Sequence, residues 1–219
     1  MTLAAVDFTA LCFIPSECCW DQARNMLNNI YREKLLNAIL FFSKKVKHPS
    51  RTKVFKLLYF LDFLHFKQTG RPVTNQNYYA WKFGPAPKDL WHELKEGKVP
   101  EDFKPYLSIQ TYKSEEGDRP GFNFKPKKNS DLAVFSPRER KILEDLAYIF
   151  EDATPSQMSE ISHLPNQPWD KTIREKGDGA LIDYLLALDK EGPISEEEAK
   201  EVEKERGEMF SNFPIKPTI

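Results

Sequence analysis

Residue types that usually mark enzymes and metal sites are scarce in this chain of 219 residues. Its four histidines are His48, His65, His92 and His163. No two of them stand at the spacing of a helical metal-binding pair or of an HExxH motif. The nine glycines are scattered and form no phosphate-binding loop, and no serine lies in a G-x-S-x-G motif. These absences predict a non-enzymatic protein with no metal and no cofactor.

Cysteine is equally scarce. The three cysteines are Cys12, Cys18 and Cys19, all close to the N-terminus. An odd count with two adjacent residues does not make a disulfide framework. A zinc site would need a fourth ligand and two-residue spacings, which are missing. We interpret the three thiols as reduced, and the sequence assigns them no function.

Long apolar runs and an excess of either charge are also missing. No stretch of 18 or more apolar residues occurs, and the N-terminal MTLAAVDFTALCFIP lacks the basic region of a signal peptide. The 32 basic and 33 acidic residues give a formal net charge of -1, so no overall field attracts the chain to nucleic acid or to anionic lipid. We therefore expect a cytoplasmic protein with no membrane partner.

What is present is a long amphipathic helix followed by a helix that is apolar on nearly all sides. The length and the 40% hydrophobic content suit one domain with a substantial core. Apolar residues at spacings of three and four predict a helix over Asp21–Lys47, which ends before Pro49. Ser50 can cap a central helix that stops at Gly70. A helix apolar on nearly all sides is normally buried.

Short extended pieces follow the central helix. They are expected at Arg71–Val73 and Tyr78–Trp81, and alternation predicts a hairpin from Leu107–Tyr112 and Phe122–Phe124. The predicted fold class is therefore mainly α (α+β), a helical core around a buried central helix with a small antiparallel β element.

The other expected helices are marked by proline and by capping residues. They cover Pro87–Leu94, Pro137 to about Phe150 after the capping box of Ser136, and Pro155–His163 after that of Thr154. Leu181–Leu188 is apolar on one side and is expected to dock on the core. The acidic segment from Ser195 to about Phe210 is expected to be a solvated or partly helical extension.

The central helix carries Asp62 among apolar neighbours, and a buried carboxylate needs a partner. The indole N–H of Trp81 and backbone N–H groups near Gly84 could supply it, which would tether the Trp81 turn to the helix. Alternatively, Asp62 meets a basic group of a binding partner. His65 shares a helical face with Asp62, so the two could form a base with its orienting carboxylate. We favour the tether, and for His65 a structural role in the core.

The aromatic turn after the central helix admits two interpretations. Trp81 and Phe83 flank Lys82, and exposed aromatic residues on a rigid frame make good partner-binding anchors. Alternating aromatic residues on a strand can equally belong to the core. Both interpretations stay open, and Pro85 and Pro87 would fix the turn in either case.

One stretch of the chain is basic without any acidic residue. Its cations are Lys44, Lys45, Lys47, Arg51, Lys53 and Lys56. Cations at the end of the first helix suit its dipole, whereas Arg51 and Lys53 fall in the first turn of the next helix, where positive charge is unfavourable. We therefore expect Arg51, Lys53 and Lys56 to bind an acidic protein surface or a phosphate backbone.

Five short blocks stand out together in this order. They are Lys56–Asp62 (KLLYFLD), Thr69–Val73 (TGRPV), Ala80–Pro87 (AWKFGPAP), Phe135–Glu139 (FSPRE) and the segment from Ser162-His163 to Pro168-Trp169. In sequence and spacing they resemble the SocA-like antitoxins, whose shared module is the Panacea domain, and the resemblance spans about Tyr31 to Lys190. The motif residues to which we assign a structural role are Tyr59, Gly84, Pro85, Pro87, His163 and Trp169.

The resemblance implies a bacterial or phage-borne antitoxin, with roles such as phage defence, that binds and silences a toxin usually encoded beside it. We divide the chain into an N-terminal extension (1–20), a Panacea-like domain (21–190) and a charged C-terminal extension (191–219). The acidic residues of the last segment could cover a basic active site on the toxin. The residues expected to bind the partner are Arg51, Lys53, Lys56, Asp62, Trp81, Lys82 and Phe83. A homo-oligomer is compatible with this expectation.

Two other functions remain open: a DNA-binding transcriptional regulator, and an adaptor that delivers a partner protein to a protease. A helix-turn-helix unit would favour the regulator. The proline-broken helices present no clear recognition helix, so binding to nucleic acid is not favoured.

Overall fold

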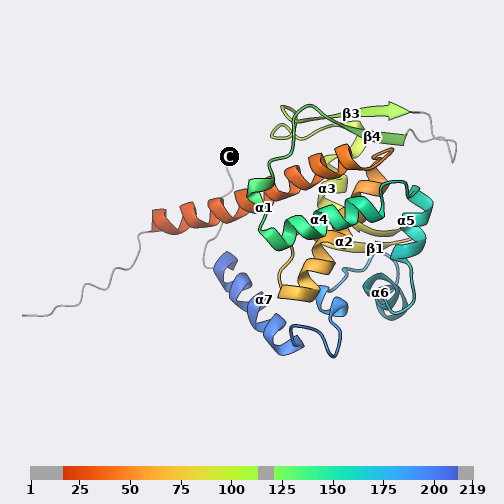
Figure 1. The fold of residues 1–219 in the computed structure, drawn as a ribbon. Helices are drawn as coiled ribbons and strands as arrows, with labels where there is room; N and C mark the ends of the chain where they lie inside the picture. Colours follow the sequence, from red (N-terminus) through yellow and green to blue (C-terminus); the bar gives the residue numbers. More distant parts are fainter. Residues whose placement is uncertain (1–16, 113–120, 212–219) are drawn as a thin grey trace, which may run out of the picture.

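The computed structural model describes residues 17–112 and 121–211, with side chains for residues 29–112 and 121–208. Within these ranges lie seven α-helices and two β-hairpins, which confirms the mainly α (α+β) class (Figure 1). The helices are α1 Glu17–Lys45, α2 Arg51–Thr69, α3 Lys88–Glu93, α4 Pro137–Ile149, α5 Pro155–Ser162, α6 Pro168–Lys176 and α7 Glu196–Ser211. Three 3-10 turns are η1 Lys95–Gly97, η2 Leu132–Val134 and η3 Tyr184–Ala187.

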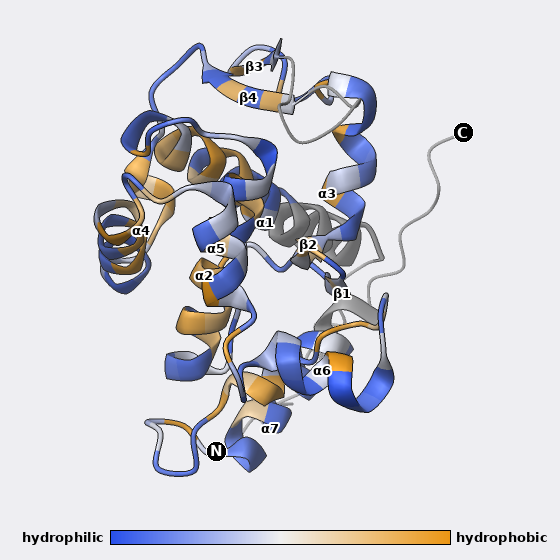
Figure 2. Cartoon of the chain, turned by 90° about the vertical axis from the view of Figure 1, so that its right-hand side faces the viewer, coloured by the Kyte–Doolittle hydropathy of each residue, from blue (hydrophilic) through white to orange (hydrophobic). Residues whose placement is uncertain are grey.

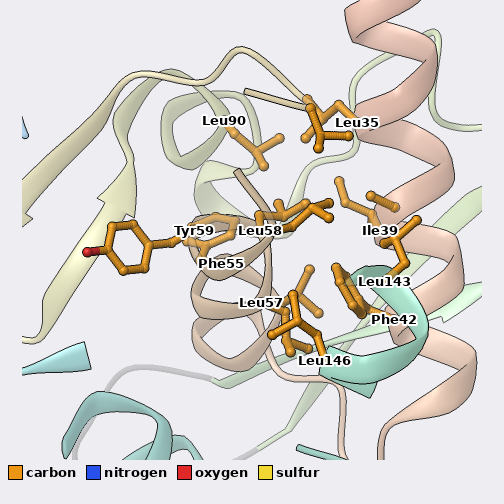
Figure 3. Close-up of a cluster of buried hydrophobic side chains, with 14 of the residues drawn as sticks. Leu35, Ile39, Phe42, Phe55, Leu57, Leu58, Tyr59, Leu90, Leu143 and Leu146 are labelled. Atoms are coloured by element: carbon orange, nitrogen blue, oxygen red, sulfur yellow. The ribbon is translucent and has the colours of Figure 1, made fainter. Parts of the chain in front are cut away.

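Helix α2 forms the centre of the core, with α1 and α4 packed on one side (Figure 3). Leu57 and Leu58 of α2 are fully buried and face side chains of the two neighbouring helices. Those neighbours include Ile39 of α1 and Leu143 of α4. Each such leucine stabilises the fold by about 1.5–3 kcal/mol through burial. Tyr59 points the opposite way, towards the β1–β2 hairpin and α6.

The ends of α2 follow the predicted capping signals. The Ser50 hydroxyl accepts a hydrogen bond from the Lys53 backbone N–H at 3.3 Å. At the other end, Gly70 has φ +68°, a left-handed conformation that glycine adopts without strain, and its N–H donates to the Phe66 carbonyl. The predicted bounds of the central helix are confirmed.

The two hairpins are antiparallel and separate from each other. β1 (Tyr78–Trp81) pairs with β2 (Gly84–Pro87), with Trp81 opposite Gly84. β3 (Leu107–Tyr112) pairs with β4 (Gly121–Pro126), which confirms the hairpin expected in this region. The segment Arg71–Val73 does not pair as a strand, and the chain bends at Val73 and Thr74.

Helices begin where the sequence predicts when a side-chain cap forms. Helix ends without such a cap differ from the predicted positions. Both capping boxes form, at Ser136 with Glu139 and at Thr154 with Gln157. Helix α1 begins four residues earlier than expected and ends at Lys45. Pro87 is not the first residue of α3 but its extended N-cap, because it still pairs within β2.

Helix α7 is docked on the domain, which corrects part of the expectation of a solvated tail. Ala199 is fully buried, and a Cβ built on Gly70 would lie 3.3 Å from its Cα. Arg206 also donates a hydrogen bond of 2.9 Å to the Asn75 side chain. The acidic residues Glu196–Glu198 face solvent, so the solvated description holds for the outer face of the helix only.

The structure covers only in part the regions on which the membrane and cysteine expectations depend. None of the described helices combines the length and apolar character needed to cross a bilayer. Cys12 lies outside the described residues, and Cys18 and Cys19 belong to α1 with side chains outside the description. The assignment of the thiols as reduced stays a prediction.

Candidate functional site

Asp62 is completely buried and accepts four hydrogen bonds from the segment that follows α2. Its Oδ1 accepts from the backbone N–H groups of Val73 at 2.8 Å and Thr74 at 2.6 Å. Its Oδ2 accepts from the Thr74 hydroxyl at 2.5 Å and the Tyr78 hydroxyl at 2.8 Å. Burial raises the pKa of Asp62 to about 6, and the four donors act in the opposite direction.

This network corrects the expected partner of Asp62. The carboxylate does hold a turn to α2, but the turn is Val73–Thr74 and not the Trp81 turn. The chain reverses at Gly70 and brings these N–H groups back alongside α2. The Trp81 side chain instead packs edge-on against Trp91, with the ring centroids 5.4 Å apart. Thr74 and Tyr78 were missed because two hydroxyl residues after a helix are too common a pattern to single out.

His65 belongs to a different set of hydrogen bonds. Its Nδ1 donates to the Arg71 carbonyl at 2.7 Å, and the Thr69 hydroxyl lies 3.3 Å away. Burial lowers the pKa of His65. In the described part of the chain no hydrogen bond joins His65 to Asp62, so the arrangement does not support a base with its orienting carboxylate.

Lys56 is the central residue of a second buried polar cluster. Only 3% of it is exposed, and its Nζ donates to the Pro85 carbonyl at 2.9 Å. Burial lowers the pKa of Lys56 to about 7. A Cβ built on Gly84, which has φ +93°, would lie 2.3 Å from Lys56 Nζ, 2.7 Å from Ser162 Oγ and 2.8 Å from His163 Nε2. Only glycine fits there.

Trp169 closes this cluster from α6. Its indole stacks on the His163 ring at 3.8 Å, and its Nε1 donates to the Trp81 carbonyl at 3.0 Å. The Tyr59 hydroxyl lies next to the backbone of Trp169, and burial raises the pKa of Tyr59. His163 Nε2 is buried without a hydrogen-bond partner among the described groups, and its pKa is lowered by burial and by Lys56.

We call this cluster the central frame. Its members are Lys56, Tyr59, Gly84, Pro85, His163 and Trp169. They come from α2, β2, the end of α5 and the start of α6, so the frame holds the β1–β2 hairpin between α5 and α6 (Figure 2). The residues of three sequence blocks thus meet in one place.

The cations of the basic stretch do not form one exposed face. The expectation that Arg51, Lys53 and Lys56 are all free to contact a partner does not hold for the two lysines. Lys53 is 1% exposed, and its Nζ donates to the carbonyls of Lys47 and Glu151 at 3.0 and 2.9 Å. Lys56 is committed to the central frame. Arg51 is half-buried, with its guanidinium 4.9 Å from the centre of the Phe122 ring, and burial lowers its pKa. The ammonium groups of Lys53 and Lys56 are therefore used inside the fold.

The three residues of the aromatic turn, at the tip of the β1–β2 hairpin, differ in their exposure to solvent. Trp81 is partly buried against the core, as the core interpretation expects. Phe83 is 75% exposed, and Lys82 is also exposed, with its Nζ 5.9 Å from the centre of the Phe83 ring. The Ser159 hydroxyl of α5 donates to the Phe83 carbonyl at 3.4 Å, so the backbone of the tip is held while its side chains point outward.

Comparison with known proteins places the five sequence blocks inside a family model. Searches of curated proteins and of solved structures found no match. The family model described as antitoxin SocA-like, Panacea domain, matches residues 54–170, just over half of the 219 residues. All five sequence blocks lie inside the matched range, including every residue of the central frame. The chain therefore belongs to the family of SocA-like antitoxins that share the Panacea domain.

Proposed function

We propose that this protein neutralises a cognate toxin, encoded beside it, by binding the toxin directly and without catalysing a reaction. Its family membership supports an antitoxin role. We place this activity in the cytoplasm. The sequence motifs of common enzyme classes are missing, and the two buried polar clusters have their hydrogen bonds committed mostly to backbone groups.

The observation that carries direct binding is the exposure of Phe83 on a held hairpin. An aromatic side chain on a rigid support loses little conformational entropy when a partner buries it, and such residues dominate many interfaces. The β2 strand beneath Phe83 is buried along its whole length. Lys82 adds a positive charge next to the ring, so the complementary toxin surface is an apolar pocket with an acidic edge.

The DNA-binding alternative loses support because Lys53 and Lys56, two of its three expected phosphate contacts, are buried. The adaptor alternative shares the binding step and differs in the fate of the toxin. A protease adaptor lowers the amount of toxin in the cell, whereas a neutralising antitoxin leaves the amount unchanged.

The test is co-expression with the product of the adjacent open reading frame, with growth, co-purification and toxin level as readouts. We expect rescued growth, a stable complex and an unchanged toxin level. Phe83→Ala should weaken the complex by about tenfold or more while keeping the wild-type Tm. Tyr148→Ala on α4, where the ring is 84% exposed, is the matched control and should bind normally. Rescue without any complex contradicts direct binding.

A further inference from the structure

A cleft lies on the side of α2 that carries Tyr59, which points away from α1 (Figure 3). Its walls come from α2, from the α5–α6 connection and from the segment around η3. Its lining includes Tyr59 of the central frame and Ser162, whose Oγ would lie 2.7 Å from a Cβ built on Gly84, so the cleft borders the frame. The frame fixes α2, α5 and α6 relative to one another, and the same contacts therefore fix the shape of the cleft.

The walls of the cleft include apolar side chains that are open to solvent. Leu64 of α2 is 40% exposed and Ile161 of α5 is 37% exposed. Phe60 lies beside them and is held by stacking on Phe150, with ring centroids 5.3 Å apart and planes at 7°. Covering these groups with another apolar side chain would remove their surface from water, which favours binding.

The size of the cleft limits what it can hold. Its volume is about 120 Å³. Pockets for cofactors and metabolites usually measure about 300–1,000 Å³. An apolar cavity of about 150 Å³ is enough for a benzene ring. The cleft therefore suits one aliphatic or aromatic side chain and is too small for a nucleotide.

The rim of the cleft carries more positive than negative charge. Lys67 of α2 is paired with Asp189 at 2.5 Å. Lys171 of α6 donates to the Leu186 carbonyl at 3.1 Å, and it has no ion-pair partner in the part of the chain described here. A carbonyl leaves the ammonium charge uncompensated, so an occupant with a carboxylate next to its apolar group complements this rim.

We propose that the cleft receives one apolar side chain of the toxin, on a toxin segment that also carries a carboxylate to pair with Lys171. This inference rests on the proposed function and adds a second contact to that of Phe83. It assigns the partner chemistry: a leucine-sized or phenylalanine-sized group with an adjacent acidic residue.

Two variants test the two parts of the contact, using the purified full-length chain and the purified product of the adjacent open reading frame. Leu64→Trp fills the cleft from a position that is already solvent-exposed, and should weaken the complex by about tenfold or more. Ile149→Trp, at an exposed apolar site on α4, is its control and should bind normally. Lys171→Glu should slow association by about tenfold, whereas Lys176→Glu on the same helix should not.

The outcomes separate this inference from the proposed function. If the wild type binds and both folded variants bind equally well, the cleft is not a contact site and direct binding by another surface stands. If Leu64→Trp does not fold, unchanged association of Lys171→Glu overturns the inference alone. If the wild-type chain forms no complex with the gene product, the proposed function and the cleft inference fail together.

Discussion

Three buried polar side chains of α2 are satisfied mainly by backbone groups and not by opposite charges. Lys53 donates to two carbonyls, Lys56 donates to one, and Asp62 accepts from two N–H groups. Each side chain reaches a different segment, so α2 organises the chain around it through polar contacts as well as apolar packing. Removing any one of them leaves buried groups without partners, which is costly.

Asp62→Ala should destabilise the protein by about 3 kcal/mol or more, because four buried donors lose their acceptor and each unmet donor costs about 1–3 kcal/mol. Asp62→Asn should cost clearly less. Its carbonyl oxygen can accept from Val73 and Thr74, and its amide N–H groups can donate to the hydroxyls of Thr74 and Tyr78. Urea denaturation of the two variants measures the difference.

Asp145→Ala is the matched control for the Asp62 variants. Its carboxylate forms an exposed ion pair with Lys141 at 2.8 Å, and such pairs contribute at most about 1 kcal/mol. Equal losses for Asp62→Asn and Asp62→Ala would mean that charge, and not the set of hydrogen bonds, is what the site requires.

Lys56 should make stability depend on pH between about 7 and 10.5. In the folded state its pKa is about 7, against 10.5 for the unfolded chain. Between these values the unfolded chain holds a proton that the folded chain has released, so stability rises with pH. Below about pH 7 both states are protonated and the full cost of burying the charge remains. Between these pH values the free energy of unfolding of the wild type should rise by up to about 1.4 kcal/mol per pH unit relative to that of Lys56→Met.

The measurement is urea unfolding of wild type and Lys56→Met at pH 7 and pH 9.5. The difference between the two proteins cancels the titration of all other groups. Lys176→Met, at an exposed site, should follow wild type at both pH values. A parallel pH dependence of wild type and Lys56→Met would show that Lys56 keeps its proton in the folded state.

At the scale of elements, the parts that sequence predicts well are those with local signals. Ser50, Gly70, Ser136 and Thr154 define helix ends through contacts within three or four residues of the chain, and all four ends form as expected. The two capping boxes are reciprocal bonds between neighbouring residues, so no knowledge of the tertiary fold is needed to place them.

Helix ends without a side-chain cap and contacts between distant residues could not be predicted in the same way. Helix α6 starts after Gln167, which makes no side-chain capping bond, so only Pro168 marks its beginning. Asp62 was expected to be buried, but its partners depend on where the chain returns after Gly70. The burial of Lys53 and Lys56 likewise depends on Glu151 and Pro85, which lie 98 and 29 residues away along the chain.

The docking of α7 should depend on Ala199. A glutamate at this fully buried position has no room beside Gly70, so Ala199→Glu should release the helix. Backbone amides of Glu196–Ser211 should then exchange with solvent about a hundredfold faster or more, while amides of α2 and α4 stay protected. Glu205→Ala, on the exposed side, should leave exchange unchanged. Retained protection of α7 in Ala199→Glu would mean that the Gly70 contact does not hold the helix.

At the scale of the whole molecule, the described part of the chain combines a hydrogen-bonded interior with an aromatic side chain that is exposed at the tip of the β1–β2 hairpin. The central frame and the Asp62 network hold the β1–β2 hairpin and the segment before it. Phe83 is the more exposed of the two aromatic residues at its tip. An antitoxin built in this way can present a preformed surface, and binding then needs little rearrangement of the backbone.

Direct binding predicts that neutralisation is stoichiometric. If the chain only occupies the toxin, residual toxin activity should fall linearly with added antitoxin, reach zero at a fixed molar ratio and not change with further incubation. A catalytic antitoxin would instead inactivate an excess of toxin over time.

Binding to the folded state also predicts that the toxin raises the Tm of the antitoxin, by a stabilisation of about 2.7 kcal/mol when free toxin reaches 100 times the Kd. The readouts are a titration of toxin activity and thermal unfolding with increasing toxin. Phe83→Ala should need more toxin to reach the same Tm, and progressive loss of toxin activity at substoichiometric antitoxin would contradict the proposal.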